Sequence, residues 1–185
     1  MASTINTTVS TDNALKEIIW LGRGGQGAFT AAKLLGAAYT IDSDDKYALA
    51  FPSFGPERRG APVRAFTKLD TRPVVDRSQT EKADYIVILD DTLYSPQLLE
   101  LLKADGMVIV NSKNEISGVC TFDAEKIASE FRLPTVNTVM LGLLTGISDI
   151  VDTENAAEAI RNYMPQKIQE RNINALLRSV QEVIK

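Results

Sequence analysis

Short apolar runs alternate along the chain with segments in which apolar residues recur at helical spacing. The runs with the length and composition of buried β-strands are 18–21, 47–51, 63–69, 84–90 and 107–111. Helices are predicted over 28–38, 95–103, 123–131, 139–147, 154–163 and 166–184. This alternation predicts an α/β domain with a doubly wound, mostly parallel sheet, a Rossmann-like three-layer arrangement and right-handed crossovers.

Local signals give these elements their expected ends. Pro52 is expected to stop the second strand, and Ser95–Pro96 to open a helix that Asp105–Gly106 closes. Asn137 is expected at the end of a further short strand, 135–137. Residues 1–14 are polar and are predicted to be a disordered extension, so that 15–185 form one domain.

Charge and hydropathy limit the kinds of partner that the chain is expected to bind. The 185 residues carry a net charge of −4, which does not favour binding to nucleic acid or to an anionic membrane. The longest apolar runs are too short to span a bilayer, and residues 1–14 lack the pattern of a signal peptide. The expected location is the cytoplasm.

The sequence contains few residues that support redox or nucleophilic chemistry. It has no histidine, which removes the commonest general base at neutral pH and most zinc and non-haem iron sites. The single cysteine, Cys120, excludes a disulfide framework and an iron–sulfur cluster held by this chain alone. Binding is therefore favoured over self-contained catalysis.

A glycine-rich loop, Gly22–Gly27, follows the first strand and opens the first helix. It matches the pattern G-x-G-x-x-G, in which glycines let backbone N–H groups approach a phosphate at the helix N-terminus. The acids at 42, 44 and 45 lie about 20 residues on, but they precede the second strand, whereas a ribose-binding acid belongs at its carboxyl end. Arg23 and Gln26 are long polar side chains suited to holding a ligand. Anion binding and a simple tight turn remain equally favoured for this motif alone.

A second loop carries adjacent arginines, Arg58 and Arg59, followed by Gly60. Loops at the carboxyl ends of neighbouring strands face the same crevice, so one of these arginines and Arg23 can converge on an anion such as a phosphate. Alternatively, Glu57 forms a surface ion pair with one of the arginines, which would contribute little to the stability of the fold.

Taken together, the two loops resemble a known family. The strings GRGGQG at 22–27 and FGPERRGAPV at 54–63, with 83–91 and 137–142, are similar to the gamma subunit of pyruvate:ferredoxin oxidoreductase (pyruvate synthase) and its 2-oxoisovalerate relative. The resemblance runs from about Ile18 to the C-terminus. The second loop favours the pyruvate branch over enzymes that act on 2-oxoglutarate or aryl pyruvates.

The resemblance implies a multisubunit enzyme in which this chain is not catalytic alone. Such an enzyme decarboxylates a 2-oxoacid oxidatively on thiamine diphosphate, passes electrons through 4Fe–4S clusters to ferredoxin, and transfers the acyl group to coenzyme A. Thiamine diphosphate, its magnesium ion and the clusters would be held by partner subunits of the alpha, beta and delta types.

Site residues follow from the resemblance position by position. The residues implied to face the ligand are Gly22, Arg23, Gly24, Gly25, Gln26 and Gly27. Those implied to contact the phosphates of coenzyme A, or a neighbouring subunit, are Arg58, Arg59 and Gly60. Asn137 either hydrogen-bonds a ligand or caps a helix. No catalytic or metal-binding residue is implied. Two alternatives stay open, a stand-alone Rossmann-type nucleotide-binding domain and a purely structural subunit.

Overall fold

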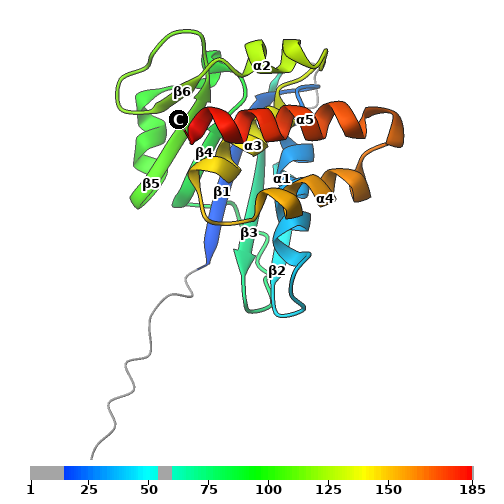
Figure 1. Cartoon of the computed structure of the whole chain (residues 1–185). Helices are drawn as coiled ribbons and strands as arrows, with labels where there is room; N and C mark the ends of the chain where they lie inside the picture. Colours follow the sequence, from blue (N-terminus) through cyan, green and yellow to red (C-terminus); the bar gives the residue numbers. More distant parts are fainter. Residues whose placement is uncertain (1–14, 54–59, 185) are drawn as a thin grey trace, which may run out of the picture.

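The computed structural model describes residues 15–53 and 60–184, and the extension predicted at 1–14 lies outside this range. A six-stranded sheet has the order β2-β3-β1-β4-β5-β6 (Figure 1). Its strands are β1 (Lys16–Arg23), β2 (Tyr47–Ser53), β3 (Pro62–Asp70), β4 (Ala83–Ile88), β5 (Leu102–Asn111) and β6 (Cys120–Phe122). The α-helices are α1 (Ala28–Thr40), α2 (Ala124–Glu130), α3 (Asn137–Ile147), α4 (Thr153–Tyr163) and α5 (Gln166–Val183). Two 3₁₀ turns are η1 (Asp91–Leu93) and η2 (Pro96–Leu101).

The sheet is mostly parallel, as predicted. β1 pairs in parallel with β4, β4 with β5, and β5 with β6. β3 lies between β1 and β2 and is antiparallel to both, so it alone runs against the other five strands. The predicted α/β class is confirmed. β2 and β3 form a hairpin within it, and the start of β3 lies beside the carboxyl end of β1.

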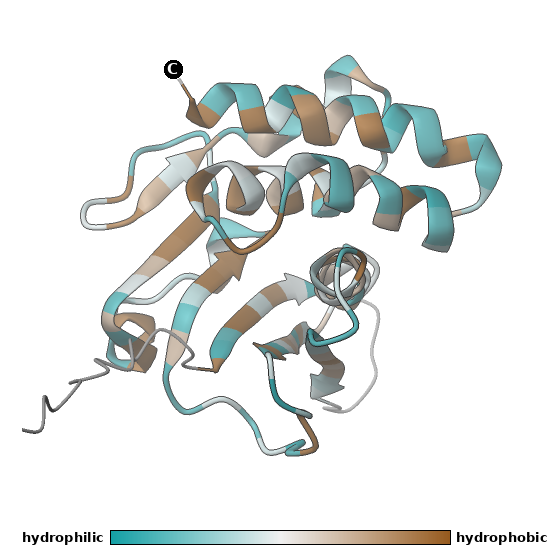
Figure 2. Ribbon diagram, turned by 60° about the horizontal axis from the view of Figure 1, so that its bottom comes forward, coloured by the Kyte–Doolittle hydropathy of each residue, from teal (hydrophilic) through white to brown (hydrophobic). Residues whose placement is uncertain are grey.

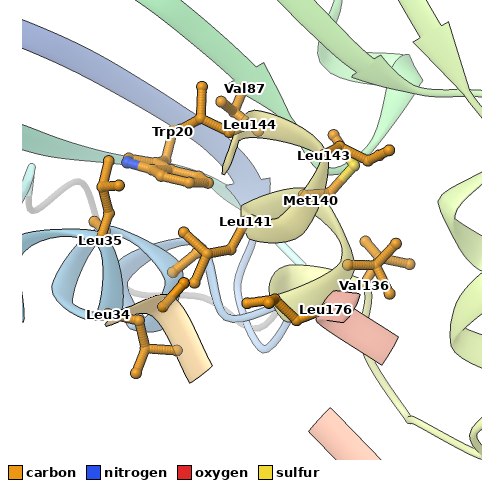
Figure 3. Close-up of a cluster of buried hydrophobic side chains, with 14 of the residues drawn as sticks. Trp20, Leu34, Leu35, Val87, Val136, Met140, Leu141, Leu143, Leu144 and Leu176 are labelled. Carbon is orange, nitrogen blue, oxygen red and sulfur yellow. The ribbon is translucent and has the colours of Figure 1, made fainter. Parts of the chain in front are cut away.

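One face of the sheet carries the main core. In β1, Ile18 and Trp20 point towards the α-helices, whereas Ile19 and Leu21 belong to the cluster on the opposite face. This period of two is the one expected of a strand that is buried on both faces. Figure 3 shows side chains of α1, α3 and α5 gathered with Trp20 in the larger cluster.

Helix α3 is the centre of the helical layer. Residues on all its sides are buried, including Met140 and Leu141, because it lies between the sheet, α1 and α5. In contrast, the long C-terminal helix α5 is amphipathic, and Figure 2 shows hydrophobic bands alternating with hydrophilic ones along it. A helix that is apolar all round requires burial, and α5 supplies that cover with its apolar side.

The opposite face of the sheet has a thinner cover. The apolar residues of this face pack against Leu98 of η2, and all five described α-helices lie on the other side. A segment without regular structure follows β3 and is tied down by polar contacts. Lys68, which is 2% exposed, donates to Asp76 at 2.9 Å, and Gln79 Nε2 donates to Ser53 Oγ at 3.1 Å. The sheet is therefore covered by α-helices on one face and by a thinner layer, a 3₁₀ turn and an irregular segment, on the other.

Several local expectations were wrong. Pro52 lies inside β2 and does not end it; the strand is at the edge of the sheet, where proline is tolerated. The helix expected from Ser95 is the 3₁₀ turn η2, and Asp105–Gly106 lies within β5 close to a register shift of the β4–β5 pairing. Asn137 is the first residue of α3, not the end of a strand. Among the described residues, no helix is long and apolar enough to cross a membrane.

Candidate functional site

The glycine-rich loop lies at the carboxyl edge of the sheet, between β1 and α1. Gly25 and Gly27 have φ values of +95° and +82°, a region that residues with a side chain rarely adopt. The Gln26 N–H donates to the Arg23 carbonyl at 2.9 Å, which closes a tight turn. The Gly24 N–H donates to the carbonyl of Ala61 at 2.9 Å, so the loop is joined to the start of β3.

Both long side chains of the loop are engaged by neighbouring groups. The Arg23 guanidinium donates from Nε to Asp90 Oδ2 at 3.1 Å, from Nη1 to the Gly60 carbonyl at 3.1 Å, and from Nη2 to Thr92 Oγ1 at 2.7 Å. Gln26 Oε1 accepts the Arg23 N–H at 2.7 Å, while Gln26 Nε2 donates to Asp90 Oδ2 at 3.1 Å. The loop is therefore held by its own side chains as well as by its backbone.

Asp90 is the residue on which these contacts converge, and the sequence patterns did not single it out. Its Oδ1 accepts the Thr92 hydroxyl and the Thr92 N–H, the latter at 3.1 Å. Burial acts to raise the pKa of Asp90, but hydrogen bonds from Thr92 and Gln26 and the Arg23 charge outweigh it, so the pKa lies below its usual value. The carboxylate is ionised at neutral pH. In the sequence, Asp90 was only part of the predicted strand 84–90 and of the string 83–91 that resembles the family.

Asn137 reaches the same loop from α3. The side chain is 6% exposed, and its Oδ1 accepts the Thr135 hydroxyl at 2.8 Å. A Cβ added to Gly27 would lie 2.5 Å from Asn137 Nδ2, so only glycine fits at this contact. Asn137 is not the N-cap of α3, which is Val136. The structure thus brings Asn137, expected either to bind a ligand or to cap a helix, against the glycine-rich loop.

A crevice opens beside the loop at the carboxyl ends of β1, β4 and β5. Gln26, Leu89 and Asn111 line both of its lobes. One lobe continues along α2 and the residues up to Val136, and the other along Asp90, Asp91 and the residues after β5. Its charged lining residues are Asp90, Asp91, Glu125 and Lys113. The described lining is therefore more acidic than basic.

The second loop is described only at its end. Arg58 and Arg59 lie outside the described residues, whereas Gly60 accepts a hydrogen bond from Arg23 as given above. The acids considered as ribose partners are not at the site. Asp42 and its neighbours follow the 13-residue helix α1, whose length of about 20 Å separates them from Gly27.

A family model described as "Pyruvate ferredoxin/flavodoxin oxidoreductase" matches residues 17–182. The chain belongs to this family. A family member named "Pyruvate synthase subunit PorC", from Methanothermobacter thermautotrophicus, is 43% identical over 91% of this chain and 96% of its own. The "Pyruvate/ketoisovalerate oxidoreductases common subunit gamma" of Pyrococcus abyssi is 41% identical over 86% of this chain and 92% of its own.

A solved family structure has the same fold. The crystal structure of pyruvate oxidoreductase subunit PORC from Thermotoga maritima is 35% identical, with a TM-score of 0.78, and covers 90% of this chain and 96% of its own. The resemblance inferred from the two loops is confirmed. The roles of the individual loop residues stay predictions.

Proposed function

We propose that this chain is the gamma subunit of a multisubunit, thiamine-dependent pyruvate:ferredoxin oxidoreductase. The enzyme would convert pyruvate, coenzyme A and oxidised ferredoxin to acetyl-coenzyme A, CO₂ and reduced ferredoxin, in the cytoplasm. The observation that carries this proposal is similarity over nearly the full length, 91% of this chain and 96% of the relative, to a protein named as a pyruvate synthase subunit.

The residues of this chain do not fit the redox cofactors of such an enzyme. A 4Fe–4S cluster takes four thiolates, and the sequence has one cysteine and no histidine. The described residues contain no group of three or more side chains that could hold a metal ion. We therefore place the clusters, thiamine diphosphate and its magnesium ion on the alpha, beta and delta-type partner subunits.

We further propose that the crevice at the glycine loop contributes to binding coenzyme A. Two features support this role. Within the described part of the chain, the N–H groups of Gly25 and Gly27 donate no backbone hydrogen bond, and we propose that they donate to the ligand. Gly60, the residue after Arg59 in the sequence, accepts a hydrogen bond from Arg23 at this edge of the sheet. Arg58 and Arg59 would supply the positive charge that the described lining lacks.

The two alternative functions, a stand-alone nucleotide-binding domain and a purely structural subunit, would need different features at this site. A stand-alone nucleotide-binding domain needs an acid for the ribose, and Asp42 and its neighbours are about 20 Å away along α1. A purely structural subunit would use the arginine loop for contacts with a neighbouring chain alone. The first alternative is disfavoured by the geometry, and the second is separated from our proposal by mutagenesis.

Purification from the native host tests the subunit assignment. A tagged copy of the chain, isolated without oxygen, is expected to bring with it thiamine-binding and cluster-binding polypeptides. The preparation should reduce a viologen dye only when both pyruvate and coenzyme A are present. Recovery of a folded, solitary chain with a bound nucleotide would contradict the assignment.

Substitution of the arginines tests the binding role. In the assembled enzyme, Arg58→Ala with Arg59→Ala is expected to raise KM for coenzyme A about tenfold, the effect of losing one charge-assisted contact, and to leave KM for pyruvate unchanged. Arg77→Ala, which removes an exposed arginine outside the crevice, is the matched control. Loss of assembly with an unchanged KM in any residual complex would favour the structural subunit.

A further inference from the structure

The side chains of the glycine loop turn towards the protein and converge on one carboxylate. Asp90 Oδ2 accepts from both Arg23 Nε and Gln26 Nε2, each at 3.1 Å. The Asp90 side chain is 17% exposed, so the ion pair with Arg23 is partly shielded from water. Charge-assisted hydrogen bonds in such surroundings fix geometry more firmly than neutral ones.

The same network reaches the two segments that border the loop. Thr92 donates its hydroxyl to Asp90 and accepts from Arg23 Nη2 at 2.7 Å, which ties the end of β4 to the loop. Arg23 Nη1 donates to the Gly60 carbonyl at 3.1 Å, which ties in the segment that enters β3. Three chain segments at the carboxyl edge of the sheet are thus held in one arrangement.

The backbone, in contrast, includes the Gly25 N–H, which donates no backbone hydrogen bond among the described residues. The N–H groups of Arg23, Gly24 and Gln26 are used within the loop or to Ala61. A Cβ at Gly25 would meet nothing within 4 Å, so open space lies beside this residue. The side chains therefore brace the loop from the protein side, while Gly25 is exposed.

We infer that Asp90 is the positioning residue of the glycine loop and that Arg23 and Gln26 act as braces through Asp90, so that the ligand is met by backbone N–H groups. This inference rests on the proposed function in one respect only, that the ligand of the loop is coenzyme A. It differs from direct binding by Arg23, because a guanidinium engaged by Asp90, Thr92 and Gly60 brings little net positive charge to a phosphate.

Asp90→Asn in the assembled oxidoreductase separates these possibilities. The amide is nearly isosteric, but its NH₂ group cannot accept hydrogen bonds from Arg23 and Gln26 in place of a carboxylate oxygen. We expect faster hydrogen–deuterium exchange in peptides that cover residues 22–30, at the N–H groups that the turn now protects. KM for coenzyme A should rise about fivefold or more, with KM for pyruvate unchanged.

Two further variants keep the test decisive. Asp105→Asn makes the same chemical change at an exposed position on β5 and should alter neither readout. Thr92→Val keeps the size of the side chain and removes the bridging hydroxyl, so it should change exchange and KM in the same direction but less. This variant replaces Asp90→Asn if the latter does not assemble.

Each outcome has one meaning. Faster exchange with a raised KM for coenzyme A supports both the positioning role and the proposed binding site. Faster exchange with an unchanged KM supports positioning and contradicts the binding of coenzyme A at this loop. Unchanged exchange overturns the inference. A lowered KM for coenzyme A in Asp90→Asn also overturns it, because releasing Arg23 would then have freed a ligand-binding side chain.

Discussion

Gly27→Ala is predicted to destabilise the chain through two separable effects. The first is backbone strain, because Gly27 has φ +82°, and a left-handed conformation costs a residue with a Cβ about 1–2 kcal/mol. The second is a collision, because the new Cβ would lie 2.5 Å from Asn137 Nδ2, and an added methyl in a packed contact costs roughly 1–3 kcal/mol. The expected loss in the free energy of unfolding is therefore about 2–5 kcal/mol.

Gly25→Ala is the matched control for the first effect. Gly25 also has a positive φ, of +95°, but a Cβ there would contact nothing within 4 Å. Only the strain should remain, so the loss should be about 1–2 kcal/mol. In the double variant with Asn137→Ala, the collision is removed, and the combined loss should fall short of the sum by roughly 1–3 kcal/mol.

Urea unfolding followed by tryptophan fluorescence provides the measurement. The sequence has a single tryptophan, and Trp20 is fully buried, so its emission reports the loss of the core. Equal losses for Gly25→Ala and Gly27→Ala would refute the argument, since the contact with Asn137 would then carry no energy. Additive losses in the double variant would refute it too.

Three other changes have defined outcomes. Gly142→Ala places a Cβ against Ser179 Oγ where α3 meets α5, and should lower stability by about 1–3 kcal/mol, seen as a Tm roughly 2–12 °C lower by circular dichroism. The pKa of Asp90 is lower in the folded than in the unfolded state, so its contribution to stability is present above about pH 4 and is lost as the pH falls further. The urea midpoint of Asp90→Asn should therefore fall less steeply than that of the parent chain over that acidic range. An unaltered pH profile would contradict this. Trp20→Phe removes the hydrogen bond from Nε1 to Thr67 Oγ1 at 3.0 Å and should cost about 1–3 kcal/mol by calorimetry, with a cost near zero excluding the bond as a stabilising contact.

The sequence predicted the elements whose apolar pattern is continuous. β1, α1 and β4 lie where the runs at 18–21, 28–38 and 84–90 indicated. A strand that is buried on both faces is apolar at nearly every position, so it is recognised from the sequence alone. It did not predict β6, three residues long, whose place in the sheet depends on pairing with β5. Nor did it predict that β3 is inserted antiparallel, since strand order depends on contacts between distant residues.

The candidate site was predicted as a location more than as a set of interactions. The glycine pattern marked the loop, and Asn137 was expected either to bind a ligand or to cap a helix; the structure brings Asn137 next to Gly27. Asp90 was missed because a single aspartate after a strand has no distinctive pattern; its role arises from the side chains that fold around it. Arg23, interpreted from sequence as a side chain that holds a ligand, is engaged by Asp90, Gly60 and Thr92.

The hairpin of β2 and β3 has a consequence for how the chain can tolerate changes in the segment that joins these two strands. Its antiparallel register is set by pairs from Tyr47↔Asp70 to Ser53↔Arg64, all of which lie before or after the joining segment. The segment that carries Arg58 and Arg59 can therefore be replaced or lengthened without moving a strand, and each doubling of its length costs only about 0.6 kcal/mol in closure entropy. The joining segments of other family members can therefore be grafted between β2 and β3 one at a time, with the register of the sheet kept.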